Sequence, residues 1–298
     1  MRLVKYLHKN KICLGVRVDD GLVADSGFAD LRQFLETPAA RRSEILTEAS
    51  GHGRPVRPEK LLAPVAERCQ IIYTGGNYAS HLAEVAHLVT PKEPVFFPGL
   101  WSSVIGPGDP IAIPEPDSTV DYEVELAFVI SKTASKVKAS EAWDYVYGYT
   151  LVNDVSARDV MQREAMQIML CKSPDTFCPV GPEIVSRDEI ADVYGLRITS
   201  TVNGVLKQDS TTGTMLTRIP ELLEFLSRTV TLQPGDVVTT GTPGGAGAFR
   251  NPPEFMSPGD TVTVAVEQIG ELTNPLVAGW LQEEGNRAQE HEAEGIHA

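Results

Sequence analysis

Two glutamates in the middle of the chain have the residue type and spacing of a metal site. Glu123 and Glu125 stand in the segment DYEVELAFVIS at residues 121–131, whose apolar content predicts a β-strand. Because residues i and i+2 of a strand point to one face, Asp121, Glu123 and Glu125 are expected to share a face. Like charges this close repel unless a cation or proton lies between them, and such oxygen ligands suit Mg²⁺, Mn²⁺ or Ca²⁺. The alternative is a solvated polar face on an edge strand.

One further residue and one loop that could bind a ligand lie where apolar strands are expected to end. Asp154 follows the segment VYGYTLVN and precedes SARD, so it can either present a carboxylate to a ligand or cap a helix, a role that Ser156 can also fill. The segment Gly241–Gly247 (GTPGGAG) also follows a predicted strand. It lacks the Lys-Ser/Thr pair of a phosphate-binding loop. A tight loop beside a ligand and a plain turn both fit it.

His81 and Glu84 are candidates for proton transfer. They lie at positions i and i+3 of a helix expected from about Tyr78 to Leu88, so their side chains are neighbours. A carboxylate beside an imidazole raises its basicity and can prepare it to activate water. A surface His–Glu pair is the alternative. Lys172, taken alone, is typical of a solvated surface lysine.

The elements that would position these residues are mostly strands. We expect strands within residues 1–25, at 70–74, 121–131 and 146–155, and late in the chain at 236–241, 261–268 and 272–278. Asn203-Gly204 between two extended segments predicts a hairpin. Helices are expected at 30–49, split by Pro38, and at 218–228. This pattern favours an α+β fold with a mixed or antiparallel sheet.

The Gly- and Pro-rich stretch SGHGRPVRP at residues 50–58 indicates a boundary between domains. We therefore expect a small N-terminal α/β domain at residues 1–65 and a catalytic domain at 66–281. The segment 282–298 is acidic and poor in apolar residues, and we expect it to be a disordered tail.

Composition narrows the possible partners and compartment. The formal net charge of −14 over 298 residues argues against a nucleic-acid partner and against docking on an anionic membrane. Four cysteines are too few for a disulfide framework, and no long apolar run predicts a membrane span. A cytoplasmic location is expected. Neither a GxSxG elbow nor an HExxH helix is present.

Taken together, the motifs resemble the fumarylacetoacetate hydrolase family over about residues 70–280. Four blocks occur in the family's order: GGNYASHLAE, DYEVELAFVI, NDVSARD and KSPDTFCPVGPEIV. They are followed by VNGVLKQ, QPGDVVTTGTPGG and SPGDTVTVAVEQIGEL. A single block could arise by chance, but the ordered set is highly specific.

The resemblance implies a fold, an assembly and a set of site residues. It implies a rolled mixed β-sheet in the catalytic domain and a homodimer. It implies that Glu123, Glu125 and Asp154 bind Mg²⁺, Mn²⁺ or Ca²⁺. It also implies that His81 and Glu84 activate water, with Lys172 and Arg158 stabilising an oxyanion. The predicted substrate-binding residues are Tyr78, Trp101, Met161, Gln162 and Thr242.

The predicted activity is metal-dependent hydrolysis of a carbon–carbon bond in a small 1,3-diketone, such as an acylpyruvate or a more hydrophobic β-diketone. A 1,3-dicarbonyl can bind one divalent ion through two oxygens, and His81 would then take a proton from the attacking water. The alternatives are a decarboxylase or isomerase of β-keto or dienol acids at the same site, or a catalytically idle binding protein.

Two departures from the family's pattern bear on the substrate. The segment Pro94–Ser103 carries no basic residue, whereas many members have one there, and Met161 stands where many have glutamine. Both changes make a pocket more apolar. We expect it to be lined by Phe97, Leu100, Trp101 and Met161 and to prefer a less charged substrate, unless Arg163 supplies a positive charge.

Overall fold

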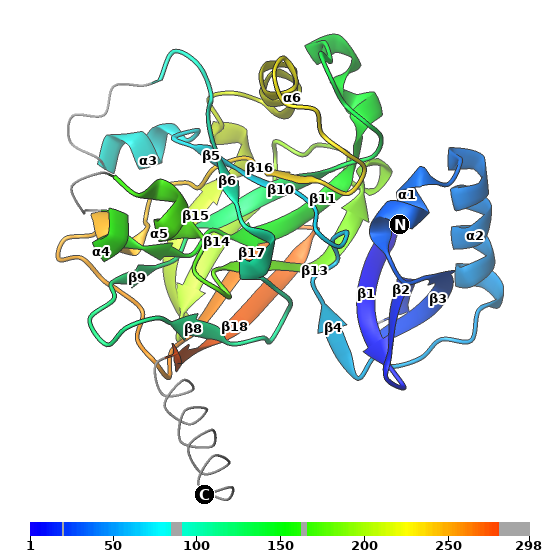
Figure 1. Ribbon diagram of the computed structural model, residues 1–298, viewed down its shortest axis with the longest axis horizontal. Helices are drawn as coiled ribbons and strands as arrows, with labels where there is room; N and C mark the ends of the chain where they lie inside the picture. Colours follow the sequence, from blue (N-terminus) through cyan, green and yellow to red (C-terminus); the bar gives the residue numbers. More distant parts are fainter. Residues whose placement is uncertain (20, 85–90, 162–165, 280–298) are drawn as a thin grey trace, which may run out of the picture.

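One large mixed sheet runs through the molecule (Figure 1). The structure is a computed structural model and describes residues 1–19, 21–84, 91–161 and 166–279. The sheet has the order β3-β2-β1-β13-β11-β10-β16-β5-β6, with β4 and β7 paired at its side. Its strands are β1 (Arg2–His8), β2 (Lys11–Asp19), β3 (Leu22–Phe28), β4 (Lys60–Leu62), β5 (Ile71–Gly75), β6 (Val95–Gly99), β7 (Val104–Ile105), β10 (Val124–Ile130), β11 (Val146–Asn153), β13 (Cys178–Ser186) and β16 (Val237–Thr239).

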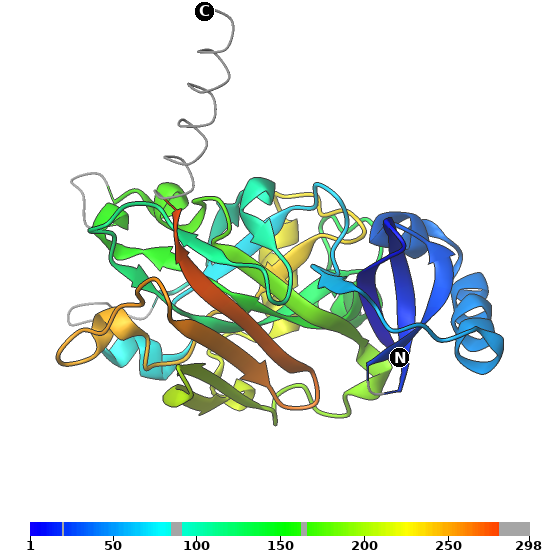
Figure 2. The same ribbon diagram turned by 90° about the horizontal axis from the view of Figure 1, so that it is seen from below.

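A second sheet of five strands packs against the first, in the order β15-β14-β17-β18-β8. Its strands are β8 (Ile111–Ile113), β14 (Arg197–Val202), β15 (Val205–Thr211), β17 (Thr261–Val266) and β18 (Gly270–Ala278). Figure 2 shows β17 and β18 crossing the molecule, in orange to red. The turn between β14 and β15 is the predicted Asn203-Gly204 hairpin, with positive φ angles of 52° and 76°.

The pairing is mixed, as the sequence predicts. β16 pairs with β5 in parallel, as do β18 with β8 and β13 with β7, while β10 and β11 are antiparallel. Short helices lie around the sheets: α3 (Ala79–Glu84), α4 (Arg158–Met161), α5 (Ile168–Lys172) and α6 (Ile219–Ser227). The predicted α+β fold class is therefore confirmed.

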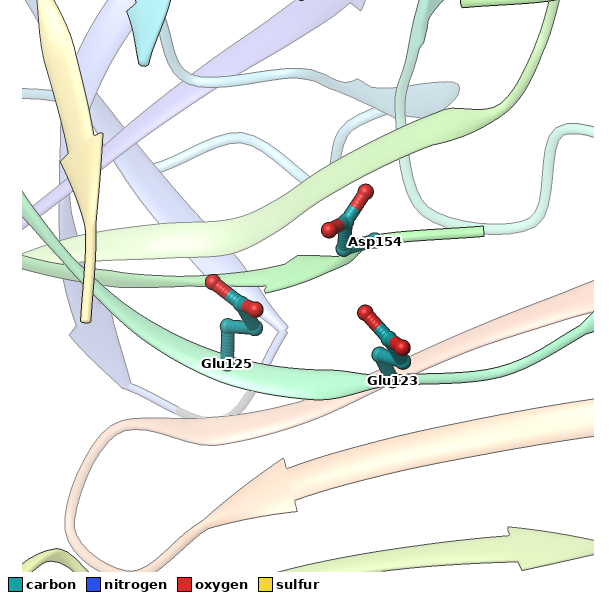
Figure 3. Close-up of side chains that lie close together, drawn as sticks. All are labelled: Glu123, Glu125 and Asp154. Atoms are coloured by element: carbon teal, nitrogen blue, oxygen red, sulfur yellow. The ribbon is translucent and has the colours of Figure 1, made fainter. Parts of the chain in front are cut away.

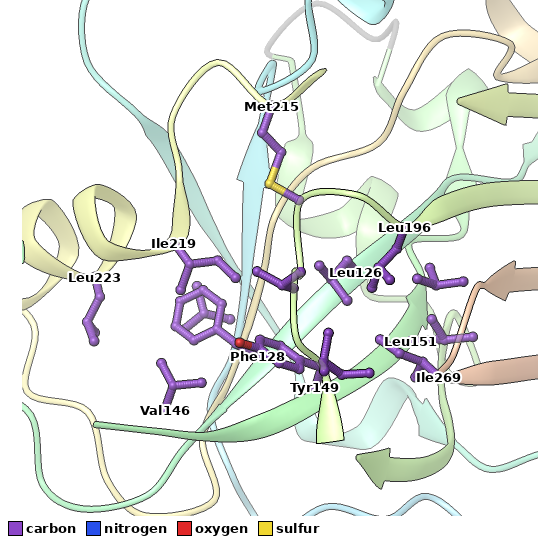
Figure 4. Close-up of a cluster of buried hydrophobic side chains, with 14 of the residues drawn as sticks. Leu126, Phe128, Val146, Tyr149, Leu151, Leu196, Met215, Ile219, Leu223 and Ile269 are labelled. Carbon is purple, nitrogen blue, oxygen red and sulfur yellow. The ribbon is translucent and has the colours of Figure 1, made fainter. Parts of the chain in front are cut away.

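Strand β10 is buried along its whole length and separates two hydrophobic cores. On one face Leu126 and Phe128 join a core between the two sheets, which α6 closes with Ile219 and Leu223 (Figure 4). On the other face Ala127 and Val129 join a second core. Because faces alternate along a strand, Glu125 lies on the face of Ala127 and Val129, at the end where that core gives way to the site.

The N-terminal elements belong to the large sheet. β1 pairs antiparallel with β13, and helices α1 (Leu31–Glu36) and α2 (Ala39–His52) cover this part of the second core. Asp30 caps α1 by accepting bonds from two backbone amides, and Pro38 precedes α2, as expected from the predicted split. The division into domains at residue 65 stays a prediction, and the predicted tail at 282–298 lies outside the described residues.

The predicted strand at 121–131 is interrupted in the structure. β9 (Val120–Asp121) pairs with β12 (Ser156–Ala157), whereas β10 begins at Val124. The alternation therefore breaks between Asp121 and Glu125. No helix in the described ranges is long and apolar enough to cross a bilayer.

Candidate metal centre and active site

Glu123, Glu125 and Asp154 meet at one buried point (Figure 3). One carboxylate oxygen from each lies within 4.8 Å of the others, and each residue is at most 4% exposed. The pairing of β10 with β11 positions them, because Glu125 lies opposite Val152, close to the end of β11. The Asp154 amide donates to the Glu123 carbonyl at 2.9 Å, and Asn153 Oδ1 accepts from the Glu123 amide at 3.1 Å. Sequence spacing and sheet register therefore agree on this triad.

Two buried cations compensate part of the triad's charge. The Lys172 ammonium lies 2.6 Å from Glu123 Oε2 and 2.5 Å from Asp154 Oδ2, while Arg158 pairs with Glu123 Oε1. Burial opposes ionisation of Glu123, but Lys172 and Arg158 outweigh it and hold the pKa of Glu123 below its ordinary value. The same carboxylates outweigh the burial of Lys172 and raise its pKa. Lys172 and Arg158 are therefore charged.

The three carboxylates of the triad outnumber these two cations, and Arg158 is also shared with Asp121. Burial raises the pKa of Asp154 to about 7, although Lys172 opposes this. Burial, together with the charges of Asp154 and Glu123, raises the pKa of Glu125 well above its ordinary value. Without a further cation, protons are held on this pair.

The residues present fit a divalent cation. Asp154 Oδ1 is buried and has no hydrogen-bond partner among the described residues, although such an atom is costly to bury alone. All three side chains offer hard oxygen ligands, which Mg²⁺, Mn²⁺ and Ca²⁺ prefer. The identity of the ion is left open by the donor set.

His81 and Glu84 lie next to each other on α3. His81 Nδ1 is 3.5 Å from Glu84 Oε2, and the other oxygen of Glu84 accepts from the Gly245 amide at 2.6 Å. The Gly244 amide donates to Ser80 Oγ at 3.1 Å, so the glycine-rich loop is bonded to α3 at two points. The sequence left this loop open between a ligand loop and a plain turn; here it fixes the carboxylate behind the imidazole.

The triad and His81 open into one pocket of about 400 Å³. Lys172, Arg158 and Thr242 line it as well, so the structure brings together eight of the twelve predicted site residues, counting Met161. The rest of the wall is largely apolar: Leu82, Pro91, Val95, Phe97, Met166, Ile168 and Phe249. This size is typical of sites for small molecules.

Three predicted residues that the structure describes do not line the pocket. Glu84 stands behind His81, Tyr78 is buried in the core between the sheets, and Trp101 packs against the second core. Leu100, expected to line the pocket, is 42% exposed. Gln162 lies outside the described residues, as does Arg163. The predicted substrate contacts of Tyr78 and Trp101 therefore have no counterpart in the wall of the pocket.

Three residues of the site were not assigned from the sequence. Gln208, on β15, donates to Thr242 Oγ1 at 2.8 Å and accepts from the Val124 amide at 3.0 Å. Phe249 packs edge-on against His81 with ring centroids 5.1 Å apart. Asp121, expected on the face of the glutamates, is not part of the triad; it bonds the loop around residue 247 and Arg158, which also pairs with Glu123. Only Asp121 had a signal in the sequence, namely its charge beside the two glutamates, and the strand interruption after it could not be foreseen from that signal.

Comparison with known proteins places the chain in a family. The model of the fumarylacetoacetate (FAA) hydrolase C-terminal domain matches residues 70–277. The chain belongs to the fumarylacetoacetate hydrolase family. Other members resemble it over most of their length. It is 40% identical to a mitochondrial oxaloacetate tautomerase of Xenopus laevis, covering 93% of this chain and 90% of the relative.

Two more family members bear on the reaction. The oxaloacetate tautomerase YisK of Bacillus subtilis is 35% identical to this chain. The match spans 90% of this chain and 97% of YisK. The crystal structure of a 5-carboxymethyl-2-hydroxymuconate delta-isomerase from Mycobacterium smegmatis superposes with a TM-score of 0.75 at 34% sequence identity. The match covers 93% of this chain and 99% of the isomerase chain. These relatives are tautomerases and an isomerase. The predicted carbon–carbon bond hydrolase of a β-diketone is therefore wrong.

Proposed function

We propose that this family member is a keto–enol tautomerase of a small 2-oxo acid of the oxaloacetate class, with a divalent cation at Glu123, Glu125 and Asp154. The observation that carries the proposal is that His81 opens into the same pocket as the carboxylate triad. The relatives named as oxaloacetate tautomerases support the reaction type. The isomerase alternative from the sequence is thus preferred to hydrolysis.

Tautomerisation requires a proton carrier and consumes no water. In the enol-to-keto direction one proton leaves the enol oxygen and one joins the neighbouring carbon, while the double bond moves from carbon–carbon to carbon–oxygen. His81 is suited to carry such a proton, since Nδ1 faces Glu84 and Nε2 is left for the substrate. Glu84 is itself held by the Gly245 amide, which limits its motion.

The remaining residues suit an anionic oxo acid. A divalent ion at the triad supplies Lewis-acid polarisation of a substrate oxygen. Lys172 and Arg158 are charged and lie in the wall of the pocket, where they favour a carboxylate group. The apolar side chains around them exclude water and strengthen these charge interactions. Small-molecule turnover, a homodimer and a cytoplasmic location stay predictions.

The test follows the loss of enol absorbance after oxaloacetate enol is diluted into buffer with Mg²⁺, with Mn²⁺ or with EDTA. We expect metal-dependent acceleration over the buffer rate. His81→Ala is expected to lower kcat by a factor of about 10² to 10⁴, the range for loss of a general acid–base group. The matched control is His52→Ala, an exposed histidine at the end of α2.

The other candidate activities are separate outcomes of the same assay. Pyruvate formation at the rate of enol loss would identify a decarboxylase. No acceleration by protein that binds Mn²⁺ would contradict the proposal and favour a binding protein.

A further inference from the structure

Asp121 is a buried carboxylate with an unusual number of donors. It is 0% exposed and lies at the end of β9, outside the metal triad. Its Oδ1 accepts from the Tyr122 amide at 2.8 Å and the Gly247 amide at 2.6 Å. Its Oδ2 accepts from the Ala248 amide at 3.0 Å and from Arg158 Nε at 3.0 Å, with Arg158 Nη2 at 2.8 Å. These donors come from two different parts of the site.

One of these donors, Arg158, connects Asp121 to the metal centre. Arg158 is buried and its Nη2 also pairs with Glu123 Oε1. Arg158 thus lies between Asp121 and a metal ligand. Without the charge of Asp121, the guanidinium would pair with Glu123 alone and compete with a cation for that carboxylate.

Two other donors, the backbone amides of Gly247 and Ala248, connect Asp121 to His81. Gly247 and Ala248 begin the short turn Gly247–Phe249, and Phe249 at its end packs edge-on against His81. The turn packs so closely here that only glycine fits at residue 247: a Cβ on Gly247 would lie 2.8 Å from Asp121 Oδ1 and 1.9 Å from the Glu254 carbonyl. The Arg158 guanidinium lies over the Phe249 ring, with Cζ 5.2 Å from the ring centroid.

We propose that Asp121 is a positioning residue that holds the two halves of the site in register, Glu123 through Arg158 and His81 through Phe249. A carboxylate is required because every group facing it donates a hydrogen bond. An asparagine would place its own N–H groups against those donors and would leave the Arg158 charge without one of its partners.

The test measures metal affinity and kinetics on the full-length protein carrying Asp121→Asn. Mn²⁺ affinity is measured by titration calorimetry and by the electron paramagnetic resonance of free Mn²⁺. We expect the Kd to rise about tenfold, the effect typical of outer-shell groups of metal sites. We also expect kcat for oxaloacetate enol to fall about tenfold at saturating Mn²⁺. This kinetic readout rests on the proposed function, whereas the Mn²⁺ readout does not.

Asp236→Asn is the matched control. Asp236 is 1% exposed, accepts from the backbone amides of Gln70 and Gln233, and lies 3.6 Å from Arg32. It is thus a buried carboxylate of the same kind, but it does not line the pocket. A general loss of stability would appear in both variants, and only Asp121→Asn is expected to change the Kd for Mn²⁺.

Phe249→Leu tests the contact with His81 separately from the contact with the metal ligand. It also tests the proposal if Asp121→Asn does not fold. It is expected to lower kcat severalfold and to leave the Kd for Mn²⁺ within twofold of wild type. The proposal is overturned if Asp121→Asn keeps the wild-type Kd, if Asp236→Asn raises it equally, or if Phe249→Leu keeps the wild-type kcat. If the wild type shows no tautomerase activity, the proposed function fails, and the Kd values of the two aspartate variants still decide the role of Asp121.

Discussion

At the scale of single residues, the site depends on a balance of buried charge. Both oxygens of Glu123 are in ion pairs, one with Arg158 and one with Lys172, and Lys172 also neutralises Asp154. Burying such charges is costly unless each has a partner. Lys172 therefore acts as a counter-ion in the metal-free protein, in addition to any role towards the substrate.

Lys172→Met tests this role. The change leaves two buried carboxylates without their shared cation, and we expect the metal-free protein to lose about 3 kcal/mol of unfolding free energy. Saturating Mn²⁺ is expected to restore part of the loss, because a ligand that binds only the folded state stabilises it. Urea unfolding with EDTA and with Mn²⁺ measures both effects.

The control for that experiment is Lys132→Met. Lys132 is exposed, lies 4.3 Å from the ring centroid of Tyr145 and does not line the pocket of the triad. The substitution Lys132→Met is expected to lower the unfolding free energy by less than about 1 kcal/mol, both with and without Mn²⁺. Equal destabilisation by the two substitutions would show that Lys172 is not a structural counter-ion.

At the scale of elements, the glycine-rich loop after β16 sets the position of α3. Gly245 has a φ of +105°, and a Cβ there would lie 2.5 Å from the Lys207 carbonyl on β15. The loop therefore passes between β15 and α3 with space for backbone alone. Its amides at residues 244 and 245 then bond Ser80 and Glu84.

Gly245→Ala is expected to move this loop and to lower kcat together with stability. Gly204→Ala is its matched control, because Gly204 also has a positive φ, +76°, but nothing within 4 Å of its Cβ position. Both substitutions cost about 1 kcal/mol for the backbone conformation, and only Gly245→Ala adds a steric cost of about 1–3 kcal/mol. Equal kcat values for the two variants would contradict the positioning of α3 by this loop.

Local patterns predicted most elements because they depend on neighbouring residues. The strands at β5, β10 and β11, the hairpin at Asn203-Gly204 and the helix break at Pro38 all follow from periodicity or turn chemistry. The interruption after Asp121 did not follow. It depends on pairing with β12 and on amides more than 120 positions later in the chain, which no local pattern reports.

The same distinction applies to the site. The triad, His81 and Lys172 were found because their motifs are local, whereas Gln208 and Phe249 reach the site only through the folded sheets. The reaction could not be read from the site residues, since one proton carrier beside a metal centre serves hydrolysis, decarboxylation and tautomerisation alike.

At the scale of the whole molecule, the N-terminal elements are joined to the catalytic part by charge as well as by strand pairing. Glu183 on β13 is 3% exposed and lies 2.5 Å from both Arg2 on β1 and Arg17 on β2. Strand β1 also pairs with β13. Together these contacts argue that the predicted domains unfold together.

Arg17→Met tests that coupling, because all three tryptophans, Trp101, Trp143 and Trp280, follow residue 65. Tryptophan fluorescence therefore arises only from residues of the predicted catalytic domain. Removing one of two cations from the buried Glu183 is expected to cost about 2 kcal/mol and to shift the urea midpoint equally by fluorescence and by circular dichroism. Arg41→Met, which breaks an exposed pair with Glu44 on α2, is expected to cost less than about 0.5 kcal/mol. A fluorescence midpoint that Arg17→Met leaves unmoved, with a separate transition by circular dichroism, would instead make residues 1–65 an independent domain.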